Sequence, residues 1–170
     1  PRKAQMHAFS SGDNEGNGLK SNYINSITSG PDSSIWIGAW GSGTHKVYGN
    51  IQNITNLRFN LINDVETSYI THSPNALWLA TQHEVYRIDP DNTETQKIRS
   101  VSNFTTSTTI YSILYAKEGN LWLGSENGLL EYRVKQDSII HHPINVGKNI
   151  IIISLVEDDS SNLWAASATK

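Results

Sequence analysis

Four tryptophans recur at nearly constant spacing along the chain of 170 residues, and this repeat limits the possible folds more than any other sequence feature. Trp36, Trp78, Trp122 and Trp164 are separated by 42, 44 and 42 residues. A serine stands ten residues before each tryptophan, an Ile or Leu directly before it, and a Gly or Ala two residues after it. The residue after each serine forms an apolar column of Ile27, Tyr69, Ile113 and Leu155. Because chance rarely keeps four such columns in step, we conclude that the chain consists of repeats.

Each repeat predicts short β-strands separated by turns. Its apolar and β-branched segments are interrupted by Gly, Asn, Asp and Pro, which is typical of all-β proteins. In the third repeat a polar turn at 117–120 precedes the tryptophan strand, and a second turn at 126–128 leads to a third strand at 129–133. A more variable fourth strand is expected near 53–60, 94–100 and 138–142. Four antiparallel strands per repeat are typical of a β-propeller blade.

The strand that carries each tryptophan predicts that both of its faces are covered. In the first three repeats it has three consecutive apolar residues, whereas a half-buried strand alternates apolar and polar side chains. Blades packed face to face would cover both sides, so we expect all four tryptophans to be buried structural residues. The small residue two places later, Gly38 or Gly124, would then allow a neighbouring sheet to approach closely.

The composition excludes several functional classes. The chain has no cysteine, which rules out disulfides, zinc–thiolate sites and a cysteine nucleophile. Its 13 basic and 16 acidic side chains give a formal charge of −3, so binding to nucleic acid through phosphate contacts is not expected. No apolar stretch of about 18 residues occurs, and we expect membrane attachment only through segments outside this chain.

The third repeat resembles a known family. Residues Ser112–Leu129 read S-I-x₅-G-N-L-W-L-G-S-x-N-G-L, which is similar to the regulator-propeller repeat of bacterial two-component sensors. The resemblance extends over residues 22–170 through four copies. The second copy departs from it by Ala80 in place of the glycine, and the fourth ends before its third strand.

The resemblance implies a domain organisation. Residues 1–21 would contain the end of a preceding blade, with an outer strand at 5–10, and a linker. Residues 22–170 would form about three and a half blades, at approximately 22–62, 63–105, 106–145 and 146–170. Since propellers usually have about 4–8 blades, we interpret the chain as a fragment of a larger propeller. The alternative is a small four-bladed ring in which the strand at 5–10 completes the last sheet.

The resemblance also implies a function. Such propellers are sensing regions of membrane receptors, often homodimeric, in the periplasm, and many of the hybrid histidine kinases respond to oligosaccharides. The chain would then be a non-enzymatic sensor segment without a cofactor, whose signalling domains lie elsewhere. Alternatives are the sensor region of a diguanylate cyclase receptor, a propeller scaffold that binds another protein, and a propeller glycosidase or lyase.

One aromatic residue stands outside the repeat and is a candidate for ligand binding. Trp40 lies in a glycine-rich turn, at Gly38–Gly43, where an aromatic ring could stack on a sugar or contact a partner. Tyr23 and His45 are near it in the sequence and share this candidacy. Packing of Trp40 against an adjacent loop is the structural alternative.

The sequence predicts neither a metal site nor a catalytic motif. The six histidines show no H-x₃-H spacing, and the adjacent His141 and His142 would point to opposite faces of a strand. Acidic clusters at Asp89–Asn92 and Glu157–Asp159 lack the pattern of a calcium loop and are interpreted as solvated turns. Nucleophile elbows, phosphate-binding loops and dinucleotide fingerprints do not occur in the sequence.

Overall fold

The computed structural model describes residues 19–30, 32, 34–47, 54–57, 69–82, 84–89, 98–100, 109–144 and 150–169. The regular elements of these residues are all β-strands, paired antiparallel, which confirms the predicted fold class. The strand expected at 5–10 lies outside the described residues.

Three sheets have four strands each and follow one another along the chain. Sheet 1 contains β1 (Ile24–Ser29), β2 (Ile35–Ala39), β3 (Gly43–Val47) and β4 (Ile54–Leu57). Sheet 2 contains β5 (Tyr69–Ser73), β6 (Ala76–Ala80), β7 (Val85–Ile88) and β8 (Ile98–Ser100). Sheet 3 contains β9 (Ile110–Tyr115), β10 (Leu121–Ser125), β11 (Gly128–Arg133) and β12 (Ser138–His142). Sheet 4 pairs β13 (Ile150–Glu157) with β14 (Leu163–Thr169).

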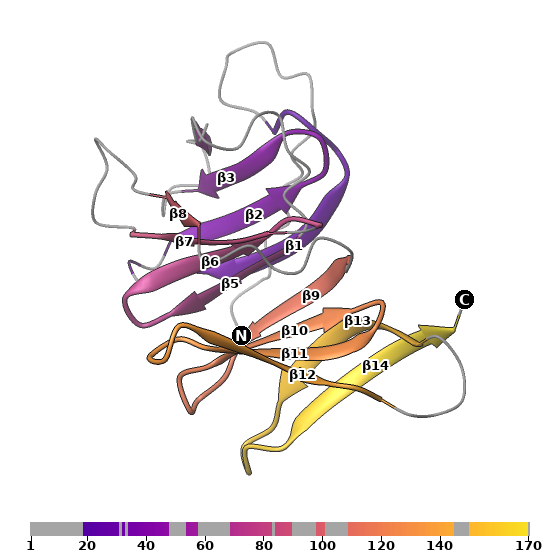
Figure 1. Cartoon of the computed structure of the whole chain (residues 1–170). Coiled ribbons are helices and arrows are strands. Elements are labelled where there is room, and N and C mark those ends of the chain that lie inside the picture. The colour runs from indigo at the N-terminus through magenta and orange to yellow at the C-terminus, as the bar shows by residue number, and fades with distance from the viewer. Residues whose placement is uncertain are drawn as a thin grey trace, which may run out of the picture.

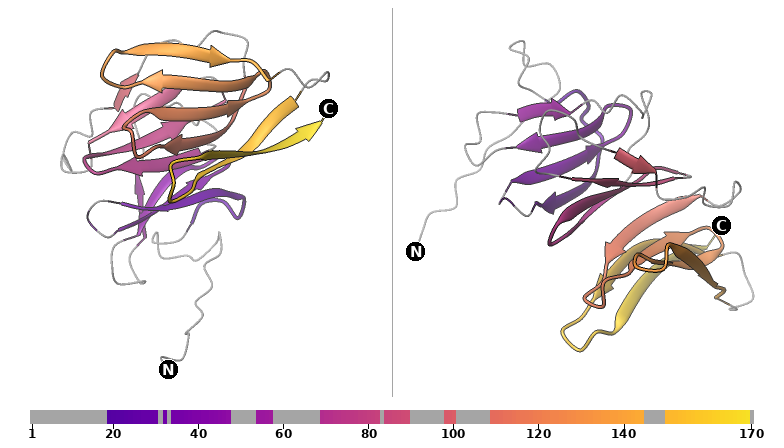
Figure 2. Two further views of the ribbon diagram at one scale, coloured as in Figure 1. Left: turned by 90° about the horizontal axis from the view of Figure 1, so that it is seen from below. Right: turned by 60° about the vertical axis from the view of Figure 1, so that its left-hand side comes forward.

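The four sheets are stacked face to face in chain order, like the blades of a propeller (Figures 1 and 2). The first strands of successive sheets contact one another, β1 with β5, β5 with β9 and β9 with β13. Sheets 1 and 4 lie at opposite ends of the stack in Figure 1.

The tryptophans of the first two repeats fill the spaces between sheets, as predicted. Trp36 is fully buried and packs with Ile70, Leu77 and Leu79 of sheet 2. Trp78 is 2% exposed, stacks on Tyr115 with ring centroids 6.5 Å apart, and meets Tyr132 edge-on at 6.2 Å. These contacts explain why β6 is apolar at consecutive positions, because sheets 1 and 3 cover its two faces.

The expectation that all four tryptophans are buried is wrong at the C-terminal end of the stack. Trp122 is only partly buried, and Trp164 is 58% exposed. The reason is that burial of each indole depends on the following sheet. Trp122 faces sheet 4, of which two strands are described, whereas Trp164 points away from sheet 3 and no described sheet covers it.

Strand pairing corrects the alignment of the second repeat by one residue. Ser26, Ser112 and Ser154 pair with the small residue two places after their tryptophan, but in sheet 2 that position, Ala80, pairs with Tyr69. The turn from β5 to β6 is shorter than its counterparts, because Ser73 pairs directly with Ala76. Ile70, and not Tyr69, is therefore the structural equivalent of Ile27 and Ile113.

The predicted close approach at the repeat glycines is visible in the structure. A Cβ atom added to Gly124 would lie 2.2 Å from Ser112 Oγ and 2.5 Å from the backbone oxygen of Ile152 in sheet 4. At Gly38 it would lie 2.6 Å from Ser26 Oγ and 3.4 Å from Ile70 of sheet 2. Glycine at this position thus lets the first strand of the next sheet contact the tryptophan strand.

Candidate functional site

Two of the three predicted binding residues lie together at one edge of sheet 1. Trp40 follows the end of β2, and its backbone N–H donates a hydrogen bond of 2.8 Å to the carbonyl of Tyr23, just before β1. The two side chains are 41% and 76% exposed. The start of β1 and the end of β2 thus hold two residues that face each other across the strand pair, and their aromatic side chains are accessible to a ligand. We call Tyr23 and Trp40 the aromatic edge.

The third predicted residue, His45, does not belong to this surface. Its side chain is fully buried, and Nε2 lies 3.0 Å from Ser42 Oγ. The sequence prediction placed His45 near Trp40 because both adjoin the same glycine-rich turn. In the structure His45 is an inner residue of β3, paired with Ile37 of β2 and Asn56 of β4, so it is not available for direct ligand contact.

The equivalent edge of sheet 3 has polar residues instead of aromatic ones. The backbone N–H of Glu126 donates to the carbonyl of Thr109 at 3.2 Å, which repeats the Trp40–Tyr23 bond. The Glu126 carboxylate accepts from the backbone N–H of Thr109 at 3.4 Å. His141 Nε2 lies 2.8 Å from the carbonyl oxygen of Asn127. The backbone scaffold of this edge is therefore shared between repeats, whereas its side chains differ.

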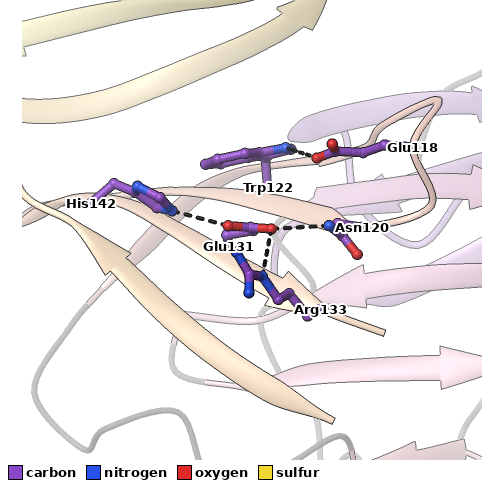
Figure 3. Close-up of polar contacts among 6 residues, drawn as sticks. All are labelled: Glu118, Asn120, Trp122, Glu131, Arg133 and His142. Atoms are coloured by element: carbon purple, nitrogen blue, oxygen red, sulfur yellow. Dashed lines mark hydrogen bonds and ion pairs between the residues drawn. The ribbon is translucent and has the colours of Figure 1, made fainter. Parts of the chain in front are cut away.

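A second polar cluster, which the sequence analysis did not identify, lies on the face of sheet 3 that carries Trp122 (Figure 3). Glu131 is at its centre, with a side chain only 7% exposed. Its Oε1 accepts from Asn120 Nδ2 at 2.9 Å and from Arg133 Nε at 3.0 Å, and its Oε2 lies 3.1 Å from His142 Nε2. The His142 ring is tilted against the Trp122 ring, with centroids 5.1 Å apart.

These contacts determine the ionisation of Glu131. Burial raises the pKa of Glu131, but the hydrogen bonds and charges of Arg133 and His142 lower it, and the net effect is a pKa below the ordinary value. The carboxylate is therefore charged and has partners on both oxygens. This arrangement is suited to holding β11 and β12 in register rather than to proton transfer.

The position of Glu131 is charged in each of the first three repeats. It is directly opposite the tryptophan on the third strand, where the other sheets have Lys46 and Arg87. Lys46 Nζ lies 5.0 Å from the Trp36 ring centroid, and Arg87 Cζ lies 5.9 Å from that of Trp78. Comparison of third strands in the sequence could have found this column, because the three charges recur in register.

In sheets 2, 3 and 4, the indole N–H of the tryptophan donates a hydrogen bond to a side chain in, or directly before, the turn between the first two strands. Trp78 Nε1 donates to Ser73 Oγ at 3.3 Å, Trp122 Nε1 to Glu118 Oε1 at 3.3 Å, and Trp164 Nε1 to Asp158 Oδ2 at 2.9 Å. The hydrogen bonds from Trp164 and Asn162 lower the pKa of Asp158 to about 2. The predicted solvated turn is confirmed for Asp158 and Asp159, whereas Glu157 is the last residue of β13 and its carboxylate accepts from the backbone N–H of Lys117 in sheet 3 at 2.7 Å.

The first turn of sheet 1 contains an ion pair in place of such a bond. Lys46 Nζ lies 2.6 Å from Asp32 Oδ2, and the Lys46 side chain is 3% exposed. Burial raises the pKa of Asp32, but hydrogen bonds from Lys46 and Ser34 lower it by a larger amount. The net result is a pKa of about 2, below the ordinary value of 3.8. The ion pair thus compensates the charge of a buried lysine beside Trp36.

Neither a metal centre nor a membrane-spanning helix is found in the described part of the chain. No three side chains among His, Asp and Glu of these residues come together as metal ligands. Within the same residues, no helix is long and apolar enough to cross a bilayer.

Comparison with protein families identifies the third repeat. Residues 106–127 match the family model described as "Two component regulator propeller", which confirms the resemblance inferred from Ser112–Leu129. A comparison with curated proteins finds no match.

Solved structures with the same arrangement confirm that the chain folds as part of a β-propeller. An extracellular domain described as that of a one-component system from B. thetaiotaomicron superposes with a TM-score of 0.74 at 21% identity, over 91% of this chain and 22% of its own length. The extracellular domain of a hybrid two-component system from the same organism gives 0.72 at 15% identity, over 95% and 21%. Virginiamycin B lyase from Staphylococcus aureus gives 0.69 at 16% identity, over 84% and 48%. The chain thus spans about a fifth of the length of the two extracellular domains.

Proposed function

Because the chain contains the two-component regulator propeller repeat, we propose that it is a ligand-sensing segment of a bacterial signal-transduction receptor. The receptor would be of the hybrid histidine kinase type, and this segment would lie in the periplasm and have no enzymatic activity of its own. The similarity of the fold to extracellular domains of B. thetaiotaomicron receptors supports this proposal. A diguanylate cyclase receptor with the same kind of sensor remains an alternative of the same class.

The aromatic edge is the observation that carries the proposal. A flat ring exposed at the end of a rigid strand can stack on the apolar face of a sugar, and neighbouring hydroxyl and backbone groups can bind its hydroxyls. Trp40 and Tyr23 provide two such rings on neighbouring residues. Only 17% of the residues are charged, which suits a neutral ligand. We therefore propose a neutral oligosaccharide as the ligand class.

The signal would be a shift between receptor conformations. In a homodimeric receptor, a ligand that binds one arrangement of the propellers more tightly than the other favours that arrangement by the difference in binding free energy. The propeller needs no catalytic group for this role. A propeller scaffold for another protein would use the same exposed rings but would not discriminate among sugars.

Similarity to virginiamycin B lyase makes an enzyme the second candidate. Its fold matches about as well as that of the receptor domains, so fold similarity alone does not separate the two functions. Glu131, the most buried carboxylate described above, is held by three partners, which favours a structural role.

Calorimetric titration with defined neutral oligosaccharides tests the proposal. Hexasaccharides of glucose, xylose, mannose and arabinose would be titrated into the chain, into Trp40→Ala and into Trp164→Ala. The last is a matched control, because it removes an exposed indole that lies on sheet 4, away from the aromatic edge. We expect one sugar to bind and Trp40→Ala to weaken its binding at least tenfold, whereas the control binds normally.

Three results would contradict the proposal. Binding that is unchanged in Trp40→Ala would remove the aromatic edge from the site. Failure of all four sugars to bind would remove neutral oligosaccharides of these types as ligands. Shortening of a bound sugar during the titration, detected by chromatography, would favour the enzyme.

A further inference from the structure

In sheets 2 and 3, a hydroxyl side chain closes the turn between the second and third strands. This hydroxyl stands three residues after the repeat tryptophan, at Thr81 and Ser125, and both residues are buried. Thr81 Oγ1 donates to the carbonyl of Glu84 at 3.4 Å and accepts from the backbone N–H of Glu84 at 3.0 Å. Ser125 Oγ donates to the carbonyl of Gly128 at 2.9 Å. Each of these turns is therefore held by a side chain at its own first residue.

The corresponding turn of sheet 1 cannot be closed in this way. Ala39 stands three residues after Trp36 and has no hydroxyl. The turn that follows contains Gly41 and Gly43, both with positive φ, and a Cβ atom added to Gly41 would meet nothing within 4 Å. Because glycine has more backbone freedom than any other residue, a turn with two glycines would leave Trp40 loosely held unless another contact restrains it.

A hydrogen bond to a buried side chain supplies this contact. Ser42 lies between the two glycines, and its Oγ is 3.0 Å from Nε2 of His45, which is fully buried in β3. This bond supplements the backbone bond from the N–H of Ser42 to the carbonyl of Ala39, which is 3.4 Å long. Because β3 is paired on both sides, with β2 and β4, His45 is a fixed point for the turn. The turn of Trp40 is thus attached to the interior of sheet 1.

The change in how the turn is held coincides with the change in what the turn presents. In sheet 3, where Ser125 closes the turn, the turn carries the polar side chains of Glu126 and Asn127. In sheet 1, where His45 holds the turn, it carries the exposed indole of Trp40. The departure from the repeat therefore occurs at the aromatic edge.

We propose that His45 is a positioning residue for Trp40, an inference that rests on the proposed function of the aromatic edge. His45 fixes the turn through Ser42, so that the indole meets its ligand in one orientation, and His45 itself does not touch the ligand. Because ordering a side chain only on binding opposes association, a loosely held Trp40 should bind its ligand about 2–10-fold more weakly than a fixed one.

Fluorine NMR of the chain labelled with 5-fluorotryptophan tests the positioning without a ligand. The chain has five tryptophans, and the resonance of Trp40 is identified by its loss in Trp40→Phe. The variants are Ser42→Ala, His45→Phe and His45→Gln, whose side-chain amide can replace Nε2. The matched control is Ser125→Ala, which removes the closing hydroxyl of the turn in sheet 3. We expect Ser42→Ala and His45→Phe to shift or broaden the Trp40 resonance, and His45→Gln and the control to leave it unchanged.

Ser42→Ala keeps the test decisive if His45→Phe does not fold, because it removes the other partner of the same hydrogen bond from a half-buried position. A Trp40 resonance that does not move in Ser42→Ala would overturn the proposal. A resonance that moves equally in Ser125→Ala would overturn it as well, because it would report a general loss of stability.

Calorimetric titration of the same variants with the hexasaccharide that binds the natural chain completes the test. We expect the affinity to fall about 2–10-fold in Ser42→Ala and to be natural in His45→Gln. Ser125→Ala should lower Tm but bind normally. Unchanged affinity in Ser42→Ala, while Trp40→Ala still weakens binding, would overturn the positioning role and leave the proposed function intact. If none of the four hexasaccharides binds, the proposed function fails, and the fluorine resonances still decide whether His45 positions Trp40.

Discussion

Replacement of the repeat tryptophans by alanine should destabilise the protein in proportion to the cover that the following sheet provides. Trp78 is 2% exposed and lies between sheets 2 and 3, whereas Trp164 is 58% exposed. A buried indole removes about 150–250 Å² from water, which corresponds to about 4–6 kcal/mol at about 25 cal/mol per Å². Measured costs of Trp→Ala in protein cores are about 3–5 kcal/mol, including the cavity that remains.

The same reasoning gives a smaller value for Trp164. Less than half of this residue is removed from water, and no described sheet encloses the space that alanine would leave. We therefore expect Trp164→Ala to cost about 1–2 kcal/mol, with Trp122→Ala between the two. In a domain of this size 1 kcal/mol corresponds to about 2–4 °C, so Trp78→Ala should lower Tm by about 6–20 °C.

Thermal unfolding followed by circular dichroism measures the difference. Equal shifts in Trp78→Ala and Trp164→Ala would refute the reasoning, because they would show that the following sheet is not what buries the indole. A Tm unchanged by Trp78→Ala would refute it as well.

Two further predictions test the turn and glycine contacts. Since the folded-state pKa of Asp32 is lowered to about 2 from 3.8, its contribution to stability is present above pH 3.8 and is lost as the pH falls toward 2. Asp32→Asn should therefore lower Tm at pH 6 and differ little from the natural chain near pH 2, and an equal difference at both values would contradict the ion pair. Gly124→Ala should lower Tm more than Gly119→Ala, because the Cβ added at Gly119 would meet only Tyr115 Oη at 3.6 Å. The positive φ of Gly119 adds some strain to Gly119→Ala. The same melting curves compare the two variants.

The repeat in the sequence was sufficient to predict the strands and their order. The repeat places a tryptophan with apolar neighbours before a turn, as Trp122 precedes the turn at Glu126–Gly128. Strand propensity and turn preference are local properties of such residues. The one-residue shift in the second repeat was missed because both Tyr69 and Ile70 are compatible with the apolar column. Only the pairing of Tyr69 with Ala80 distinguishes them.

The candidate binding surface was predicted in part. Trp40 was singled out because it departs from the repeat, and its exposure agrees with a role at the surface, although ligand binding itself stays a prediction. His45 was included for its nearness in the chain, but alternation and pairing within a sheet decide exposure, and they place it inside. The Glu131 cluster was missed because the partners of Glu131 come from the turn before β10 and from the two strands β11 and β12.

Sequence alone therefore determined that this chain forms repeated antiparallel sheets, because strand propensity, turns and the spacing of the indoles are encoded within each repeat of about 43 residues. The tertiary structure decided which of four equivalent tryptophans are buried, since burial is a property of the neighbouring sheet and not of the repeat that carries the residue. Identical local patterns at Trp36 and Trp164 thus lead to a filled interface in one case and an open face in the other.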